Sequence, residues 1–279
     1  MMATRLTSLQ LIWALVALSG KCSARIHDQM GLDISGGSDS VVPQAKIIGS
    51  SPSGSSARQG NMFVFSMSYQ PEFCYQHRKD GYPGCLNPNP IWKSSLTIHG
   101  LWPEFTDGSW PSTCSDEKFS QQTVDDIGLN RFELYWPNVK VRSGEDGYMR
   151  FWDHEWTKHG TCTGLRQDAY FKTALDNALA TPDIVGDNYG ESVKKVDLIQ
   201  GFVDASSASQ SSTGDAANMF VAVCDHSGKY LSEVRVCLDM DDNGFPAGVC
   251  ECPTTVLNEG QCHDDINIPV FPSDALEER

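Results

Sequence analysis

At 279 residues, the chain is long enough for one large domain or two small ones. Its formal net charge of −15 argues against a stable nucleic-acid binder at neutral pH, because two negative surfaces repel each other. The charge does not argue against an enzyme that holds a polyanion in a small cationic site. Nor does it argue against one that works at acidic pH, where carboxylates become protonated.

The N-terminus has the pattern of a secretory signal peptide over residues 1–24. Arg5 precedes a short apolar run from Leu9 to Leu18, and the small residues before Arg25 predict a cut after Ala24. No later stretch approaches the ~20 apolar residues of a membrane span, so no membrane partner is expected. These features predict a protein that is secreted, or delivered to the lumen of an acidic vacuole or lysosome.

The rest of the chain predicts a single folded domain. Residues 25–60 are rich in glycine and serine and predict a low-complexity, disordered arm. The folded domain is expected over residues 61–265, followed by an acidic C-terminal tail over 266–279 that is surface-bound or loose. The order of the elements predicts an α+β domain with a central antiparallel sheet flanked by helices and stapled by disulfides. Strands are expected at 63–69, 94–99, 219–224 and 230–238, and helices at 117–130, 147–163, 167–180 and 190–201.

Ten cysteines fit an oxidising compartment. A cut after Ala24 would remove Cys22 and leave nine, which implies one free thiol or one intermolecular bond. The cysteines are widely scattered and form no paired Cys-x-x-Cys motifs, so disulfides are favoured over metal sites.

The segment from Phe151 to Cys162 has the composition of a chemical site. If it is helical, at ~100° per residue, two histidines, a glutamate and a lysine share one face, with two tryptophans beside them that can pack into a core. Histidine titrates near neutral pH and lysine provides a positive charge for a phosphate, so the set suits acid/base chemistry on an anion. The residues on this face are His154, Glu155, Lys158 and His159, and the tryptophans are Trp152 and Trp156.

Two other interpretations fit this segment. A zinc hydrolase needs histidines four residues apart, whereas His154 and His159 are five apart with Lys158 between them, which disfavours Zn²⁺. A solvated surface helix with a Glu155–Lys158 ion pair is the other alternative, since isolated charge patterns commonly lie on solvated faces.

A second segment, Leu96 to Pro103, places His99 at the predicted end of a strand, followed by glycine. The loop after it carries Trp102, Phe105 and Trp110. Loop aromatics can stack on nucleobases, although each could equally be a core residue.

Together, the two segments L-T-I-H-G-L-W-P and F-W-D-H-E-W-T-K-H-G-T-C resemble the active-site segments of the secreted acid ribonucleases of the ribonuclease T2 family. The resemblance implies that His159 is the base for the ribose 2′-OH and His99 the acid for the leaving 5′-oxygen. It further implies that Lys158 and Glu155 stabilise the phosphorane and that His154 holds the phosphate.

The resemblance also implies base-binding residues and disulfides. One base site would use Trp102, Glu104 and Trp110, and a second would use Phe151, Gln70 and Asn138. The implied disulfides are Cys74–Cys85, Cys114–Cys162, Cys224–Cys262 and Cys237–Cys252, with Cys250 as a spare thiol that could compete with Cys252.

The resulting hypothesis is a metal-independent endoribonuclease that needs no cofactor. Attack by the 2′-OH gives a 2′,3′-cyclic phosphate and then a 3′-phosphate, and DNA lacks this nucleophile. The expected partner is single-stranded RNA, the protein is expected to be a monomer, and the expected optimum is roughly pH 4–6, where histidine and carboxylates titrate. The alternative from another class is a catalytically idle relative that serves as a secreted recognition or storage protein.

Overall fold

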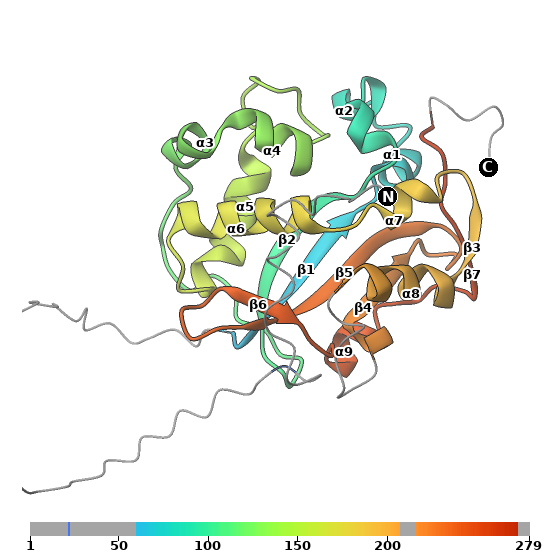
Figure 1. Ribbon diagram of the computed structural model, residues 1–279. Coiled ribbons are helices and arrows are strands. Elements are labelled where there is room, and N and C mark those ends of the chain that lie inside the picture. The colour runs from blue at the N-terminus through green and yellow to red at the C-terminus, as the bar shows by residue number, and fades with distance from the viewer. Residues whose placement is uncertain (1–21, 23–59, 207–215, 273–279) are drawn as a thin grey trace, which may run out of the picture.

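A five-stranded antiparallel sheet forms the centre of the protein (Figure 1). The computed structural model describes residues 22, 60–206 and 216–272. The strands run in the order β2-β1-β5-β4, and β6 pairs with β5. The sheet strands are β1 (Met62–Ser68), β2 (Thr97–Glu104), β4 (Phe220–Cys224), β5 (Leu231–Met240) and β6 (Pro246–Val249), and a separate pair is formed by β3 (Ser192–Lys194) and β7 (Asp265–Asn267).

The helices lie beside the two ends of this strand order. In Figure 1, α3 to α6 gather near β2, and α8 lies near β4. Within the described residues, no helix has the length and apolar character needed to cross a membrane. The α-helices are α1 (Gln70–Gln76), α2 (Pro83–Leu86), α3 (Gln121–Ile127), α4 (Leu129–Tyr135), α5 (Arg150–Lys158), α6 (Gln167–Ala180), α7 (Ile184–Asp187), α8 (Lys195–Ala205) and α9 (Thr254–Leu257).

The predicted fold class is confirmed, and the differences from prediction have local causes. The helix expected over 117–130 is divided into α3 and α4 at Gly128, whose φ of 103° is incompatible with a continuous right-handed helix. The segment expected to be a helix from residue 190 begins as strand β3 and becomes helical at Lys195. The strand expected to end at His99 continues to Glu104.

The expected domain boundary at residue 265 is wrong. Ile266, Ile268 and Phe271 are at most 1% exposed, and Tyr69 donates a hydrogen bond of 2.9 Å from its hydroxyl to the carbonyl of Pro269. The acidic composition of this segment suggested a tail that does not pack on the domain. Its apolar side chains pack into the core instead, and burial of each contributes roughly 1.5–3 kcal/mol to stability. Most of the predicted signal peptide and residues 25–59 of the predicted arm lie outside the described residues.

The main core joins one face of the sheet to an aromatic cluster from the helices. Side chains alternate between the two faces of the sheet, so that Phe63, Phe65 and Val236 point into this core, whereas Met62 and Val64 of β1 belong to a second buried cluster. The aromatic cluster consists of Phe132, Trp136, Trp152, Trp156, Tyr170 and Phe171, which contact one another through their rings.

The helices also cover the exposed edge of β2. Trp136 Nε1 donates to the carbonyl of His99 at 2.9 Å, and the Tyr170 hydroxyl donates to the carbonyl of Leu101 at 3.0 Å. A sheet edge otherwise leaves such groups unpaired. The strand that carries His99 is therefore attached to the helices through its backbone.

Five disulfides are present, and they include all four bonds implied by the family resemblance. The expectation that Cys250 is a spare thiol is wrong for this chain, because Cys250 is bonded to Cys22. Cys250 is 1% exposed and belongs to a small buried cluster with Met62 and Val64. Cys22 packs against this cluster. The predicted cut after Ala24 would remove Cys22, whereas a cut before Cys22 would retain the bond.

This pairing predicts the thiol content of the protein. When Cys22 is retained, alkylation of the denatured but unreduced protein should label no cysteine, because the described cysteines are all bonded. Cys22→Ser should label Cys250 alone, and the double variant with Cys250→Ser should again label none. Peptide mass spectrometry reads the result, and a labelled Cys250 in protein that still contains Cys22 would contradict the bond.

Candidate active site

A β-bulge in β2 turns His99 and Trp102 toward the same face of the sheet. Side chains alternate along a regular strand, so residues three apart would point to opposite faces. The pairing of β1 with β2 slips by one residue at His99, which has no direct partner on β1. The rings of His99 and Trp102 then meet edge to face, with their centroids 5.0 Å apart. His99 therefore lies within the strand, not at its end as the sequence suggested.

Helix α5 supplies the other half of the site. Trp152 and Trp156, one turn apart, are at most 1% exposed and anchor the helix in the aromatic cluster, as predicted. His154 and Lys158, also one turn apart, are exposed. The Lys158 side chain forms no ion pair in the part of the chain that the structure describes, and Glu155 is 1% exposed. The interpretation as a solvated helix with a Glu155–Lys158 ion pair is therefore wrong.

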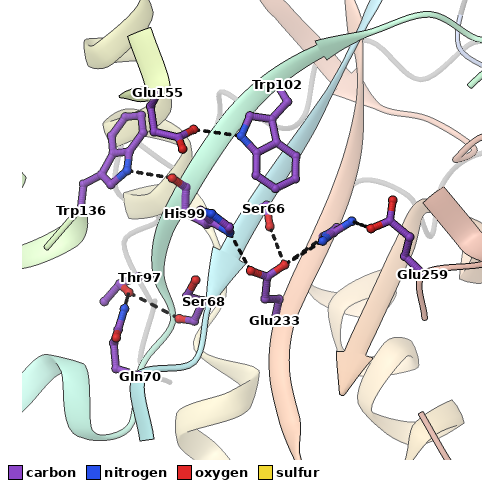
Figure 2. A network of polar contacts seen from close by, with 11 residues as sticks. Ser66, Ser68, Gln70, Thr97, His99, Trp102, Trp136, Glu155, Glu233 and Glu259 are labelled. Carbon is purple, nitrogen blue, oxygen red and sulfur yellow. Dashed lines mark hydrogen bonds and ion pairs between the residues drawn. The ribbon is translucent and has the colours of Figure 1, made fainter. Parts of the chain in front are cut away.

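A buried hydrogen bond links the strand to the helix. Trp102 Nε1 donates to Glu155 Oε2 at 2.9 Å (Figure 2). The bond needs a glycine beside it, because a Cβ at Gly100 would lie 2.1 Å from Trp102 Nε1 and 2.2 Å from Glu155 Oε2. The glycine after His99 thus leaves room for the contact that brings the two segments together.

His159 completes the group at the end of α5. Its side chain is 9% exposed, and its ring stacks on Trp102 with 5.4 Å between centroids. The amide of Thr113 donates to the carbonyl of Lys158 at 3.0 Å, and the Cys114–Cys162 disulfide closes the same region. The indole of Trp102 therefore contacts both histidines that the sequence singled out for acid/base chemistry.

His99 is held on its other side by a carboxylate that the sequence reasoning missed. Glu233 Oε1 lies 2.6 Å from His99 Nδ1, and Glu233 Oε2 accepts hydrogen bonds from Ser66 and Arg235 (Figure 2). Arg235 also pairs with Glu259. The available signal was the alternation of Glu233 and Arg235 with valines, which places both charges on one face of a strand. Nothing in the sequence linked that face to His99.

The two histidines have opposite shifts in pKa. Burial and then the charges of Lys158, His154 and His99 lower the pKa of His159 to about 3. Burial also acts to lower the pKa of His99, but the hydrogen bond and charge of Glu233 outweigh it, so that this pKa is raised above its usual value. Burial, followed by the charge of Lys158, lowers the pKa of His154. In weak acid, His159 is neutral and His99 is charged.

The carboxyl groups of Glu155 and Glu233 also differ in pKa. Burial raises the pKa of Glu155 to about 7, even though His99, Trp102 and Lys158 oppose the shift. Glu233 is also buried, but the hydrogen bond and charge of His99 together with Arg235 outweigh burial and lower its pKa to about 2. At pH 5, Glu155 is a neutral acid and Glu233 is an anion.

A cavity of about 520 Å³ opens beside these groups. The cavity carries cationic and histidine side chains, although the chain as a whole has a formal charge of −15. The structure brings Gln70, Asn138 and Phe151, three of the predicted base-binding residues, to this cavity. It is also lined by His99, Lys140, Arg150, His154, Glu155 and Glu233.

The other predicted base-binding residues lie elsewhere. Glu104 is on β2 beyond Trp102, and burial followed by the charge of Glu259 raises its pKa to about 7. Trp110 is 63% exposed, and within the described ranges its ring contacts neither histidine. Trp102 contacts His99, His159 and the guanidinium of Arg235, so its ring is part of the frame of the site. In the same described part of the chain, no group of three or more histidine, cysteine and carboxylate side chains is arranged to hold a metal ion.

The raised pKa of Glu155 predicts greater stability in acid. A carboxyl whose folded pKa lies at about 7, against 4.5 in a free side chain, stabilises the fold fully below about pH 4.5 and loses this effect as the pH rises through 7. Glu155→Gln keeps an acceptor for Trp102 but cannot titrate. Between pH 5 and 7.5, the wild type should lose on the order of 1–3 kcal/mol more unfolding free energy than this variant, at about 1.36 kcal/mol per pKa unit.

Urea denaturation of both proteins at the two pH values measures this difference. Equal losses in the wild type and Glu155→Gln would show that Glu155 is ionised in the folded protein at both pH values.

Both segments that build the site lie within a match to a known protein family. The family model described as the Ribonuclease T2 family matches residues 60–252. The chain is 30% identical over 223 residues to the intracellular ribonuclease LX of Solanum lycopersicum, covering 76% of this chain and 84% of the relative. It is also 30% identical over 232 residues to Ribonuclease 1 of Arabidopsis thaliana, covering 78% of this chain and 90% of the relative.

Solved structures show the same fold. The RNase-related protein from Calystegia sepium superposes with a TM-score of 0.56 at 21% identity, covering 76% of this chain and 98% of that one. Ribonuclease MC1 from the seeds of bitter gourd superposes with a TM-score of 0.54 at 25% identity, covering 74% of this chain and 98% of that one. The chain therefore belongs to the Ribonuclease T2 family and is an endoribonuclease of that family.

Proposed function

We propose that the protein cleaves single-stranded RNA without a metal ion, by transfer of the phosphate to the neighbouring 2′-oxygen. The 2′-OH attacks the phosphorus, the bond to the 5′-oxygen breaks, and the product is a 2′,3′-cyclic phosphate that water opens to a 3′-phosphate. The step needs one base and one acid. DNA is not a substrate, because it has no 2′-OH.

The observation that carries this proposal is the pair of histidines on Trp102 with opposite pKa shifts. His159, with a pKa of about 3, is neutral in weak acid and accepts the proton of the 2′-OH. His99, whose pKa is raised, is charged in the same range and donates its proton to the leaving 5′-oxygen. Both histidines contact the half-buried indole of Trp102, so the acid and the base are held in a fixed relation to each other.

The remaining groups suit the negative charge that accumulates on the phosphoryl oxygens. Lys158 is exposed and has no ion pair among the described residues, so its ammonium group is available to an anion. Glu155 is protonated below pH 7, so it does not repel the phosphate, and its free oxygen can donate a hydrogen bond. His154, which also lines the cavity, would hold the phosphate in the ground state.

The cavity next to His99 is the proposed site for a base flanking the cleaved bond. Phe151 provides a ring for stacking, and Gln70 and Asn138 provide amides. The Gln70 Nε2 donates to Thr97, whereas its buried Oε1 has no partner among the described residues and is available as an acceptor. Structures of bitter gourd ribonuclease MC1 variants were solved with 5′-UMP and with 5′-GMP. A further base site formed by Trp102, Glu104 and Trp110 remains a prediction.

An acidic compartment on the secretory route is the proposed location. The signal-like N-terminus and the disulfides support this route. The relatives include an extracellular and an intracellular ribonuclease of Solanum lycopersicum, so the destination beyond that route differs between similar proteins.

The histidine variants test the mechanism. In excess EDTA at about pH 5, the wild type should cleave single-stranded RNA to ends that carry a 2′,3′-cyclic phosphate. His159→Ala and His99→Ala should each lower kcat/KM by about 10²–10⁴-fold, the range for loss of one general acid or base. A substrate with a single 2′-deoxy nucleotide at the cleaved position should not react.

Three outcomes would contradict the proposal. Activity that requires a divalent metal would favour a metal hydrolase. Activity that survives His159→Ala would show that the base is misassigned. A folded wild-type protein without any cleavage would favour the idle relative that binds or stores.

The pKa shifts also predict the pH profile of kcat/KM. Activity should rise as His159 loses its proton at about pH 3 and should fall as His99 loses its proton above its usual value of 6.5. The maximum is therefore expected between these limits, at roughly pH 4–6. Initial rates on a short defined RNA at constant ionic strength measure the profile, and an alkaline or flat optimum would contradict it.

A further inference from the structure

We propose that Glu233 is a positioning residue for the general acid: it holds the His99 ring in one orientation and keeps it protonated in the working pH range. This inference rests on the proposed function, in which His99 protonates the leaving oxygen. Glu233 does not touch the substrate in this scheme and acts only through His99.

Three strands build the contact. Glu233 on β5 reaches His99 on β2 across the intervening strand β1, with 2.6 Å between Glu233 Oε1 and His99 Nδ1. Ser66, on β1 between them, donates its hydroxyl to Glu233 Oε2 at 3.1 Å. The bulge at His99 puts its ring on this face of the sheet, where it can reach the carboxylate (Figure 2).

Arg235 restricts the carboxylate further. Its Nη2 and Nε lie 3.0 and 3.2 Å from the same Oε2 of Glu233, and its side chain is 12% exposed. The guanidinium also lies over the Trp102 ring, 5.3 Å from its centroid, and pairs with Glu259 on the outer side. Glu233 is therefore hydrogen-bonded on both oxygens and is held in place.

This contact determines which nitrogen of His99 is available. With Nδ1 bonded to Glu233, Nε2 is the nitrogen left to face the reacting phosphate. A carboxylate on Nδ1 also stabilises the imidazolium form. The charged and titratable groups that face His99 are Glu233 and Arg235 from β5, and Glu155, His154 and His159 from α5 and its C-terminal end. Among them, Glu233 is the group that hydrogen-bonds the ring.

The ionisation of Glu233 fits this role. Its pKa of about 2 keeps it an anion through the acid range, whereas the Glu155 carboxyl on α5 is neutral there. Without the Glu233 charge, burial and Arg235 would both favour neutral His99. Loss of Glu233 should therefore deprotonate the general acid at a lower pH and leave the base, His159, unchanged.

The test compares Glu233→Gln with wild type on two substrates that differ in their leaving group. One is a ribodinucleoside monophosphate, whose 5′-oxygen must be protonated. The other is a nucleoside 3′-(p-nitrophenyl phosphate), whose leaving group departs without a proton. Glu191→Gln is the matched control, because it removes the same charge at an exposed position.

For Glu233→Gln, kcat on the dinucleotide should fall by about 10-fold or more, and kcat on the nitrophenyl ester by less than about 3-fold, since only the first reaction uses the acid. The alkaline limb of the pH profile should move down by roughly one pH unit, and the acidic limb should not move. Glu191→Gln should match the wild type in both. His99→Ala should show the same dependence on the leaving group, with a larger loss.

Equal losses on both substrates, or an alkaline limb that does not move, would overturn the proposal and leave Glu233 with a structural role alone. If Glu233→Gln does not fold, Glu233→Asp keeps the charge but withdraws it from Nδ1, and it should show the same leaving-group dependence.

A failure of the proposed function can be distinguished from a failure of this inference. If wild type cleaves neither substrate, the proposed function fails, but ¹⁵N NMR of His99 still tests Glu233. The neutral ring should carry its proton on Nδ1 in the wild type, and its pKa should be lower in Glu233→Gln. Identical His99 spectra and titrations in the two proteins would overturn the inference.

Discussion

The hydrogen bond from Trp102 to Glu155 joins the two segments of the chain that make the site. It connects an edge strand to a helix through atoms that are largely removed from water, where an unpaired indole or carboxyl would be costly. Several local features depend on it. Gly100 has no side chain because a Cβ would occupy this space, and the bulge at His99 brings Trp102 to the right face. The same indole then packs against His99 and His159, so a structural contact also sets the spacing of the proposed acid and the proposed base.

Two buried glutamates near the same histidine acquire different charges from their surroundings. Transfer of a carboxylate into a protein interior costs several kcal/mol unless charged partners and hydrogen bonds compensate. Glu233 has His99, Arg235 and Ser66 as direct partners and stays ionised. Glu155 has an indole as its hydrogen-bond donor, which does not offset its burial, so it takes up a proton near neutrality. An anion beside the proposed acid and a neutral carboxyl near the proposed phosphate site would both suit a reaction in which negative charge builds up on phosphoryl oxygens.

The strong negative charge of the chain and its activity on a polyanion are compatible because the site is small. The cavity gathers Lys140, Arg150 and His154 on a chain whose formal net charge is −15. In weak acid, carboxylates on the surface become neutral and repulsion of RNA declines, while His99 gains its charge. The same change in pH therefore favours binding and proton donation together. It also stabilises the fold through Glu155, so stability and chemistry favour the same conditions.

The sequence alone determined the family of this protein and most of the elements that hold its candidate site. Residue periodicity was enough for strands β1, β4 and β5 and for helix α6, since burial of an alternating or helical face is a local property, whereas β6 was not predicted. The histidines, Lys158 and Glu155 could be named because each reactive group lies in one of two short segments. The partners of those groups were decided by the tertiary structure. Glu233 lies 134 residues from His99, and the bulge, the Cys22–Cys250 bond and the buried Phe271 likewise depend on segments far apart in the chain. The direction of each pKa shift was also beyond the sequence, because it depends on burial and on charges that only folding brings together.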